Sequence, residues 1–252
     1  MTRYPEIIES VEQLDEVMTR PSAALVEFLG GLSGRLVVLG AGGKMGPSLC
    51  TRAARAVRDA SGNLAVVGVS RFSDEAARAQ LESAGVETIA CDLMDPSSVA
   101  ALPDADYVIF LVGWKFGTSE SPGRTWTVNT LTPSLAAERY RDARIVALSS
   151  GNVYPFVSPA SGGADESCAP SPIGEYAWSC LGRERVFQHW SDVHNTRVAL
   201  IRLNYAVDLR YGVLVDLAST IKAGGPVDLT TGFLNCVWQG DANDLIIRSL
   251  SL

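Results

Sequence analysis

The chain has 252 residues, of which 47% are hydrophobic and 19% charged, and its formal net charge is −7. This composition provides a substantial core for one large α/β domain, or for one domain with a small addition. The negative charge and the scattered basic residues argue against a nucleic-acid partner. Five cysteines without C-x-x-C spacing and two histidines indicate no metal site. The N-terminus has no secretory signal pattern, and no apolar run approaches the roughly 20 residues of a membrane span. We therefore expect a cytoplasmic protein with no membrane partner.

Residues 1–34 precede the first strand-like run and are predicted to form a helical extension. An apolar stripe with helical spacing follows Ser10, which is a suitable N-cap. Pro21 interrupts this stripe, and a second short amphipathic segment follows it. The pattern fits a helical brace packed on the domain, with a partner-binding arm as the alternative.

From Arg35 onward, apolar strand-like runs alternate with helical runs. The candidate strands lie at 35–40, 64–69, 86–90, 106–112, 144–149 and 197–203. The helices between them lie at about 46–60, 74–84, 126–141 and 175–194. Later come a predicted helix near 213–223, extended pieces near 227–238 and a last helix from Asp241. This alternation predicts an α/β fold with a doubly wound parallel sheet, the Rossmann fold.

The first strand leads into a glycine-rich turn. Four apolar residues, 36–39, are followed by glycines at positions 40, 43 and 46 and then by a helix. The glycines permit a tight turn, and the helix N-terminus offers free N–H groups and a positive dipole end to a pyrophosphate. A structural role in packing the turn is the alternative. The turn residues that we expect to bind a dinucleotide are Gly40, Gly42, Gly43, Lys44, Met45 and Gly46.

The ends of the second and third strands bear on the choice of cofactor. A carboxylate after the second strand would bind the ribose 2′-hydroxyl of NAD, whereas this chain has Ser70 and Arg71. A hydroxyl and a guanidinium suit the 2′-phosphate of NADP, so we expect NADP rather than NAD, although Arg71 can also be a solvated loop residue. Asp92 and Leu93 follow the third strand, where we expect the adenine. Asp92 can equally cap a helix after Pro96.

Two further segments complete a pattern. Ser149-Ser150-Gly151-Asn152-Val153-Tyr154 ends the fifth strand, and Gly174-Glu175-Tyr176-Ala177-Trp178-Ser179-Cys180 begins the next helix. A long Pro-, Ser- and Gly-rich loop at 155–172 separates them and is typical of a functional loop. Together with the glycine turn and the Asp-Leu pair, these segments resemble the extended short-chain dehydrogenases/reductases, in the NAD(P)-dependent epimerase/dehydratase branch, from about residue 35 onward.

The resemblance implies a catalytic group of serine, tyrosine and lysine. Ser150 matches the serine that bonds the substrate oxygen, and Tyr176 matches the general acid/base tyrosine. Asn129 matches the asparagine behind the nicotinamide, and Asn152 and Asn204 are expected to bind substrate. An ordinary helical tyrosine is the alternative for Tyr176.

The family lysine is absent. It would stand four residues after the tyrosine, on the same helix face, where its charge lowers the pKa of the phenol. Cys180 occupies this position. Lys115 follows the fourth strand, near the predicted ligand edge of the sheet, and is our candidate for a compensating catalytic cation. A solvated loop lysine is the alternative.

These patterns predict an NAD(P)-dependent oxidoreductase or epimerase/dehydratase that acts on a hydroxylated, sugar-like small molecule. A catalytically silent NADP-binding redox sensor or regulatory protein is the alternative, since the lysine is lost. The expected parts are a helical extension at 1–34, an NAD(P)-binding domain at 35–204 and a shortened substrate lobe at 205–252. The resemblance also implies a homodimer formed through the helices at 126–141 and 175–194.

Overall fold

The computed structural model describes residues 4–230 and 232–251. Its centre is a six-stranded, all-parallel sheet in the order β3-β2-β1-β4-β5-β6. The strands are β1 (Ser33–Leu39), β2 (Asn63–Ser70), β3 (Glu87–Ala90), β4 (Tyr107–Phe110), β5 (Arg144–Ser150) and β6 (Arg197–Leu203). The order reverses between β1 and β4, which makes a switch point of the kind where open α/β sheets bind ligands. The predicted doubly wound Rossmann fold is confirmed.

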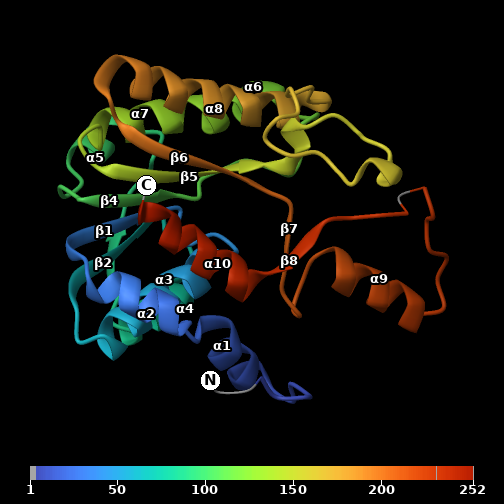
Figure 1. Ribbon diagram of the computed structural model, residues 1–252, viewed down its shortest axis with the longest axis horizontal. Helices are drawn as coiled ribbons and strands as arrows, with labels where there is room; N and C mark the ends of the chain where they lie inside the picture. Colours follow the sequence, from blue (N-terminus) through green and yellow to red (C-terminus); the bar gives the residue numbers. More distant parts are fainter. Residues whose placement is uncertain (1–3, 231, 252) are drawn as a thin grey trace.

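Helices cover both faces of the sheet (Figure 1). On one side lie α5 (Pro96–Ala100), α6 (Pro122–Trp126), the π-helical turn η1 (Thr127–Leu131), α7 (Thr132–Arg139) and α8 (Gly174–His194). On the other lie α2 (Ala23–Gly30), α3 (Gly46–Asp59), α4 (Glu75–Ser83) and α10 (Gln239–Arg248), with α1 (Val11–Thr19) packed outside α3. The helix expected at 126–141 is therefore three successive helical pieces. None of the helices in the described ranges combines the length and apolarity that crossing a bilayer requires.

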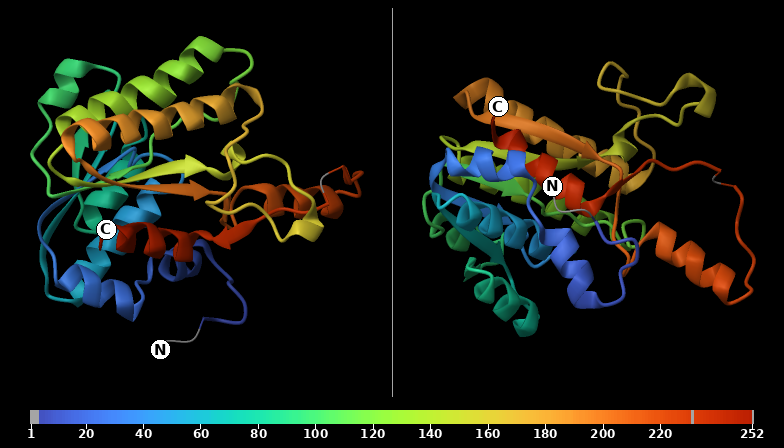
Figure 2. Two further views of the ribbon diagram at one scale, coloured as in Figure 1. Left: turned by 45° about the horizontal axis from the view of Figure 1, so that its top comes forward. Right: turned by 60° about the horizontal axis from the view of Figure 1, so that its bottom comes forward.

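A second, two-stranded sheet continues beyond β6. Tyr205–Val207 (β7) pairs in parallel with Cys236–Trp238 (β8), and α9 (Val213–Lys222) lies between them in the chain. Figure 2 shows this part projecting from the end of the main sheet. The last long helix begins at Gln239, two residues before the predicted start at Asp241, because β8 leads directly into it.

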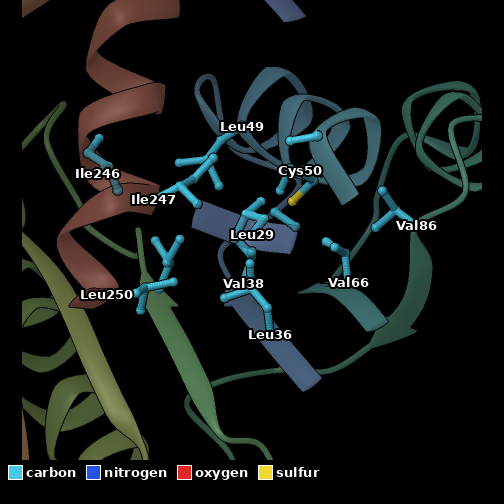
Figure 3. Packing of buried hydrophobic residues seen from close by; sticks show 14 of the residues in the cluster. Leu29, Leu36, Val38, Leu49, Cys50, Val66, Val86, Ile246, Ile247 and Leu250 are labelled. Atoms are coloured by element: carbon cyan, nitrogen blue, oxygen red, sulfur yellow. The ribbon is translucent and has the colours of Figure 1, made fainter. Parts of the chain in front are cut away.

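The core consists of two apolar layers that share the central strands. In β1, Leu36 and Val38 face the layer under α3 and α10, whereas Val37 and Leu39 face the layer under α7 and α8. Such alternation is the period-two pattern of a strand buried on both faces. Figure 3 shows the first layer, where residues of α10 meet those of α3 and β1. Both sides of the sheet are thus fixed rigidly beneath the switch point.

The N-terminal helices are held to the domain by a buried arginine. Ser10 and Ser22 cap α1 and α2, as expected for Ser10. Arg52 of α3 is 2% exposed, donates to the Met18 carbonyl at 3.0 Å and pairs with Asp244 of α10 at 3.1 Å. Ser22 donates to the same carboxylate through its N–H and its hydroxyl. Arg52, Asp244 and Ser22 therefore join α1, α2, α3 and α10 in one junction.

Candidate nucleotide-binding and catalytic site

The glycine turn lies at the carboxyl end of β1 and requires its glycines. Gly40 has φ +92°, a left-handed conformation that glycine adopts without strain. A Cβ on Gly46 would overlap the Ala41 carbonyl, and one on Gly42 would lie 2.7 Å from Ser70 Oγ. Packing within the turn therefore requires glycine at these positions, and the turn carries no side chains there.

Helix α3 begins at the end of this turn. Met45 is its N-cap residue and no side chain caps its first N–H groups. Uncapped N–H groups of a 14-residue helix, together with its dipole, form a favourable site for a diphosphate. The bare turn and the open helix end together fit the pyrophosphate of a dinucleotide.

A cavity of about 280 Å³ extends from this turn across the ends of β2 and β3. Ser70 and Arg71 line it after β2, and Asp92 and Leu93 line it after β3. Of the two interpretations of Asp92, the structure rejects the helix cap, because Asp95 accepts the N–H groups at the start of α5. The Asp92 carboxylate instead accepts the Met94 N–H within the cavity wall.

The opposite wall of the cavity comes from the segment after β4. It is formed by residues 111–114, together with Arg124 of α6 and Val128 and Thr132 of the following helices. The guanidinium of Arg124 stacks over the Trp114 ring at 4.2 Å, so a cation and an aromatic surface share this wall. The cavity therefore spans the switch point between β1 and β4.

The catalytic candidates lie where β5 and α8 meet. Ser150 ends β5 and is buried, and its side chain acts on the hydroxyl of the half-buried Tyr176 of α8. Cys180 is fully buried one turn later on α8, among Val153, Leu181 and Tyr176. The sequence thus brings a hydroxyl and a phenol together, with a neutral thiol where a cation was expected.

Burial is the main cause of the raised pKa values of Tyr176 and Cys180, at the place where β5 and α8 meet, which we call the catalytic corner. The pKa of Tyr176 is raised to about 12, mainly by burial and next by the adjacent Cys180, while Ser150 and the Arg183 charge oppose the rise. Burial also raises the pKa of Cys180, which keeps that thiol neutral.

Asn129, in the π-helical turn η1, is fully buried and joins three elements. Its Oδ1 accepts the Trp114 N–H at 2.8 Å, and its Nδ2 donates to the Trp114 carbonyl at 3.1 Å and to Ser179 Oγ at 2.8 Å. These bonds occupy its amide behind the cavity wall. Asn129 therefore positions the β4 loop, residues 111–121 between β4 and α6, against α8.

Arg183 is the unexpected member of this group. It is 4% exposed and lies two helical turns beyond Tyr176. Its Nη2 donates to Asn129 Oδ1 at 2.7 Å and its Nη1 to the Leu148 carbonyl at 2.8 Å. A positive charge therefore lies directly beneath the loop that carries Trp114.

A model of the NAD dependent epimerase/dehydratase family matches residues 36–207, more than half of the chain. The chain belongs to this family. Membership confirms the resemblance to the short-chain dehydrogenases/reductases and the prediction of an NAD(P)-dependent enzyme. The matched region contains the glycine turn, the cavity wall and the serine–tyrosine corner. Comparison with curated proteins gives no match.

Solved structures of the family share the fold. UDP-glucuronic acid 4-epimerase from Bacillus cereus, in complex with UDP-glucuronic acid and NAD, is 18% identical, has a TM-score of 0.68, and the match covers 83% of this chain and 71% of that one. UDP-glucose 4-epimerase from Thermus thermophilus, in complex with NAD, is 20% identical at TM-score 0.69, with 86% and 74% covered. dTDP-glucose 4,6-dehydratase from Streptomyces venezuelae is 17% identical at TM-score 0.73, with 85% and 71% covered. At these identities the similarity concerns the fold.

Two predicted residues, Lys44 and Lys115, are not among the residues that line the cavity. The Nζ of Lys44 lies between the rings of Phe116 and Tyr211, 5.2 and 4.8 Å from their centroids. Lys115 is exposed, and its Nζ lies 5.5 Å from the ring of Tyr205 on β7. The β4 loop is therefore linked by cations both to the glycine turn and to the second sheet.

The two predicted substrate residues come from neighbouring strand ends. Asn204, after β6, lies against Gly151, where a Cβ would overlap its side chain. Asn152 follows Gly151, is exposed, and donates its N–H to Ser150 Oγ at 3.2 Å. The parallel pairing of β5 and β6 brings these asparagines to the same edge of the sheet.

Sequence reasoning missed Arg183 and the walls provided by Trp114 and Arg124. Arg183 had a recognisable signal, because residues seven apart lie on the same face of a helix and Arg183 follows Tyr176 at that spacing. Trp114 and Arg124 had none, since their approach depends on the path of an irregular loop.

Proposed function

We propose that this family member transfers a hydride between NAD(P) and a hydroxyl-bearing carbon of a nucleotide sugar. The observation that carries this proposal is that Ser150, at the carboxyl end of β5, acts on Tyr176 of α8, one strand beyond the β4 end that lines the dinucleotide cavity. The nucleotide-sugar class is supported by the named substrates of the structural neighbours, UDP-glucuronic acid and UDP-glucose. The smaller β7–β8 sheet and α9, at the carboxyl edge of the main sheet, are proposed to form the substrate side.

In the oxidative step, Tyr176 takes the proton of the substrate hydroxyl while the carbon loses its hydride. Ser150 donates to the same substrate oxygen and holds it at the phenol. The nicotinamide, when bound, accepts the hydride and can return it. Asn129 fixes the β4 loop that forms the cavity wall, and Asn152 and Asn204 orient the sugar. Burial of the corner excludes water from the exchange.

The test combines turnover with product analysis. The purified chain is incubated with NAD or NADP and, in turn, UDP-glucose, UDP-glucuronic acid and dTDP-glucose. We expect an altered sugar by chromatography, with reduced nicotinamide accumulating if the net reaction is an oxidation and not if the hydride returns. Nucleotide binding without any altered sugar would contradict the proposal and favour the redox-sensor alternative.

We propose NADP as the preferred cofactor, supported by Ser70 and Arg71 in the cavity wall. Calorimetric titration with NADP and NAD tests this preference. Arg71→Ala should weaken NADP binding about tenfold, as expected for loss of a charged phosphate contact, and leave NAD binding unchanged. Arg141→Ala, which removes an exposed arginine beside Asp142 and outside the cavity lining, is the matched control. Equal affinity of the unaltered enzyme for both nucleotides would make the preference wrong.

We propose a homodimer formed through η1–α7 and α8. Leu131, Trp178 and Val193 on these elements are large and exposed, as side chains at a subunit contact would be in the isolated chain. Sedimentation analysis of the purified enzyme should give twice the chain mass. A monomer at micromolar concentration would contradict the proposal.

A further inference from the structure

One helical turn after Tyr176, where the family has a lysine, α8 carries Cys180, which is neutral. A charge that supports the phenol has to come from elsewhere. Lys115 is exposed, lies on a loop, and has the ring of Tyr205 as its neighbour. A buried, fixed charge would act more strongly, because water screens an exposed one.

Arg183 is a buried charge on the same helix as Tyr176. Helical side chains lean towards the N-terminus of their helix, so a residue at position 183 reaches back over the turn of Ser179 and Cys180. The contacts agree, because Nη2 bonds Asn129, whose amide also bonds Ser179. A Cβ on Gly113 would lie 2.8 Å from Nη2, so the guanidinium lies directly behind the cavity wall.

The charge of Arg183 is also not neutralised by a direct partner. Its hydrogen-bond acceptors are an amide oxygen and a backbone carbonyl, and its Nε has no partner. Within residues 4–230 and 232–251, no carboxylate forms an ion pair with it. The adjacent Glu184 is turned to Arg202, at 2.8 Å, and to the Ser149 hydroxyl.

We propose that Arg183 is the positioning residue that replaces the missing lysine, supporting the phenolate of Tyr176 from the turn beneath Cys180 and holding Asn129. This inference rests on the proposed function, because an effect of Arg183 on catalysis requires Tyr176 to be the acid/base residue. The titratable and charged groups that act on Tyr176 are Cys180 and Arg183 on α8, and the Ser150 side chain from β5 also acts on it. Lys115, from the β4 loop, acts on Cys180. Of these groups, only Arg183 combines burial with a positive charge that lowers the pKa of Tyr176.

The direct test follows the ionisation of the phenol at position 176. Tyr176 is replaced by difluorotyrosine, whose phenol is more acidic and titrates spectroscopically in an accessible pH range. Arg183→Gln should raise the pKa of this phenol by about one unit, because a nearby positive charge is removed. Arg183→Lys should restore most of the shift, since it keeps a charge. Arg185→Gln, the same change at an exposed site on the same helix, should leave the titration unchanged.

A folded Arg183→Gln protein with an unaltered phenol titration would overturn the proposal and leave Arg183 a purely structural role. The titration requires neither nucleotide nor substrate. If nucleotide binding or turnover fails while the shift is observed, the proposed function is wrong and the electrostatic role of Arg183 stands.

A second measurement covers the case in which Arg183→Gln does not fold. Cys180→Lys in the natural background would place two cations on adjacent turns and should lower the melting temperature below that of Cys180→Met. In the Arg183→Gln background, Cys180→Lys should instead restore folding and the phenol titration. Equal effects of Cys180→Lys in both backgrounds, or failure of the double variant to fold, would overturn the proposal.

Discussion

Two buried arginines, Arg52 and Arg183, lie on helices that cover opposite faces of the main sheet. Arg52 is 2% exposed and bonded to the Asp244 carboxylate, and it joins α1, α3 and α10. Arg183 is 4% exposed, but its hydrogen-bond partners are neutral oxygens. A paired charge has little field beyond its partner, whereas a charge held by dipoles continues to act on its surroundings. The first arrangement fits an architectural junction and the second fits a site that must favour a negative oxygen.

The largest expected effect concerns the oxygen that Arg183 is proposed to support. Tyr176→Phe should lower kcat about 10³-fold, because general acid/base catalysis contributes roughly 10²- to 10⁴-fold. The affinity for NAD, measured by calorimetry, should stay the same, since the phenol lies outside the cavity lining. Activity equal to that of the unaltered enzyme would remove Tyr176 from the mechanism.

The next effect breaks the junction of Arg52. Asp244→Asn should lower the free energy of unfolding by about 3 kcal/mol, because it leaves the buried Arg52 charge without its counterion. Denaturant unfolding measures the loss. Asp104→Asn, in the exposed pair with Arg139, is the control and should cost about 0–1 kcal/mol. Equal losses in the two variants would contradict the distinction between the buried and the exposed pair.

The pH dependence of kcat/KM tests the proposed ionisation of Tyr176. In the proposed mechanism the active form for oxidation carries the Tyr176 phenolate, and burial raises the pKa of this phenol to about 12. Below that value the ionised fraction rises about tenfold per pH unit, so kcat/KM for oxidation should rise with the same slope from neutral pH to about pH 10. Rates measured in constant-ionic-strength buffers test this slope. A plateau near neutral pH would show a much lower pKa.

The smallest effect is expected at the outer edge of the N-terminal junction. Asp15 of α1 pairs with Arg210 at 2.7 Å, and both side chains are about one-third exposed. Asp15→Asn should lower the free energy of unfolding by only about 0.5 kcal/mol, because such pairs are screened by water and salt. A loss as large as that from Asp244→Asn would mean that the outer pair is energetically part of the buried junction.

The parallel sheet and the glycine turn were predictable from local patterns, since continuous apolar runs and glycine spacing reflect short-range backbone requirements, whereas the order of the strands came only from the structure. Helix starts were less predictable. Asp92 and Asp95 are equally good caps by residue type, and the exit of the chain from β3 decides in favour of Asp95. The expected start at Asp241 was wrong because β8 delivers the chain into α10 at Gln239.

The catalytic corner was only partly predictable. Ser150 and Tyr176 were proposed from the motif, and the adjacent positions of β5 and α8 in the fold bring them to the same place. Arg183 was missed because its burial depends on Asn129 and Leu148, which come from two other elements. Long-range partners of this kind decide whether an arginine on a helix is solvated or buried, and a single sequence does not display them.

The junction at Arg52 has a consequence for the order in which the chain acquires its structure. Asp244 receives hydrogen bonds from Arg52, 192 positions earlier, and from Ser22, 222 positions earlier. During synthesis, α1, α2 and α3 leave the ribosome long before α10 can cover them. Their apolar faces stay open in the meantime, and such nascent surfaces slow folding and attract chaperones. Helix α10, made long after them, therefore completes the packing of α1, α2 and α3.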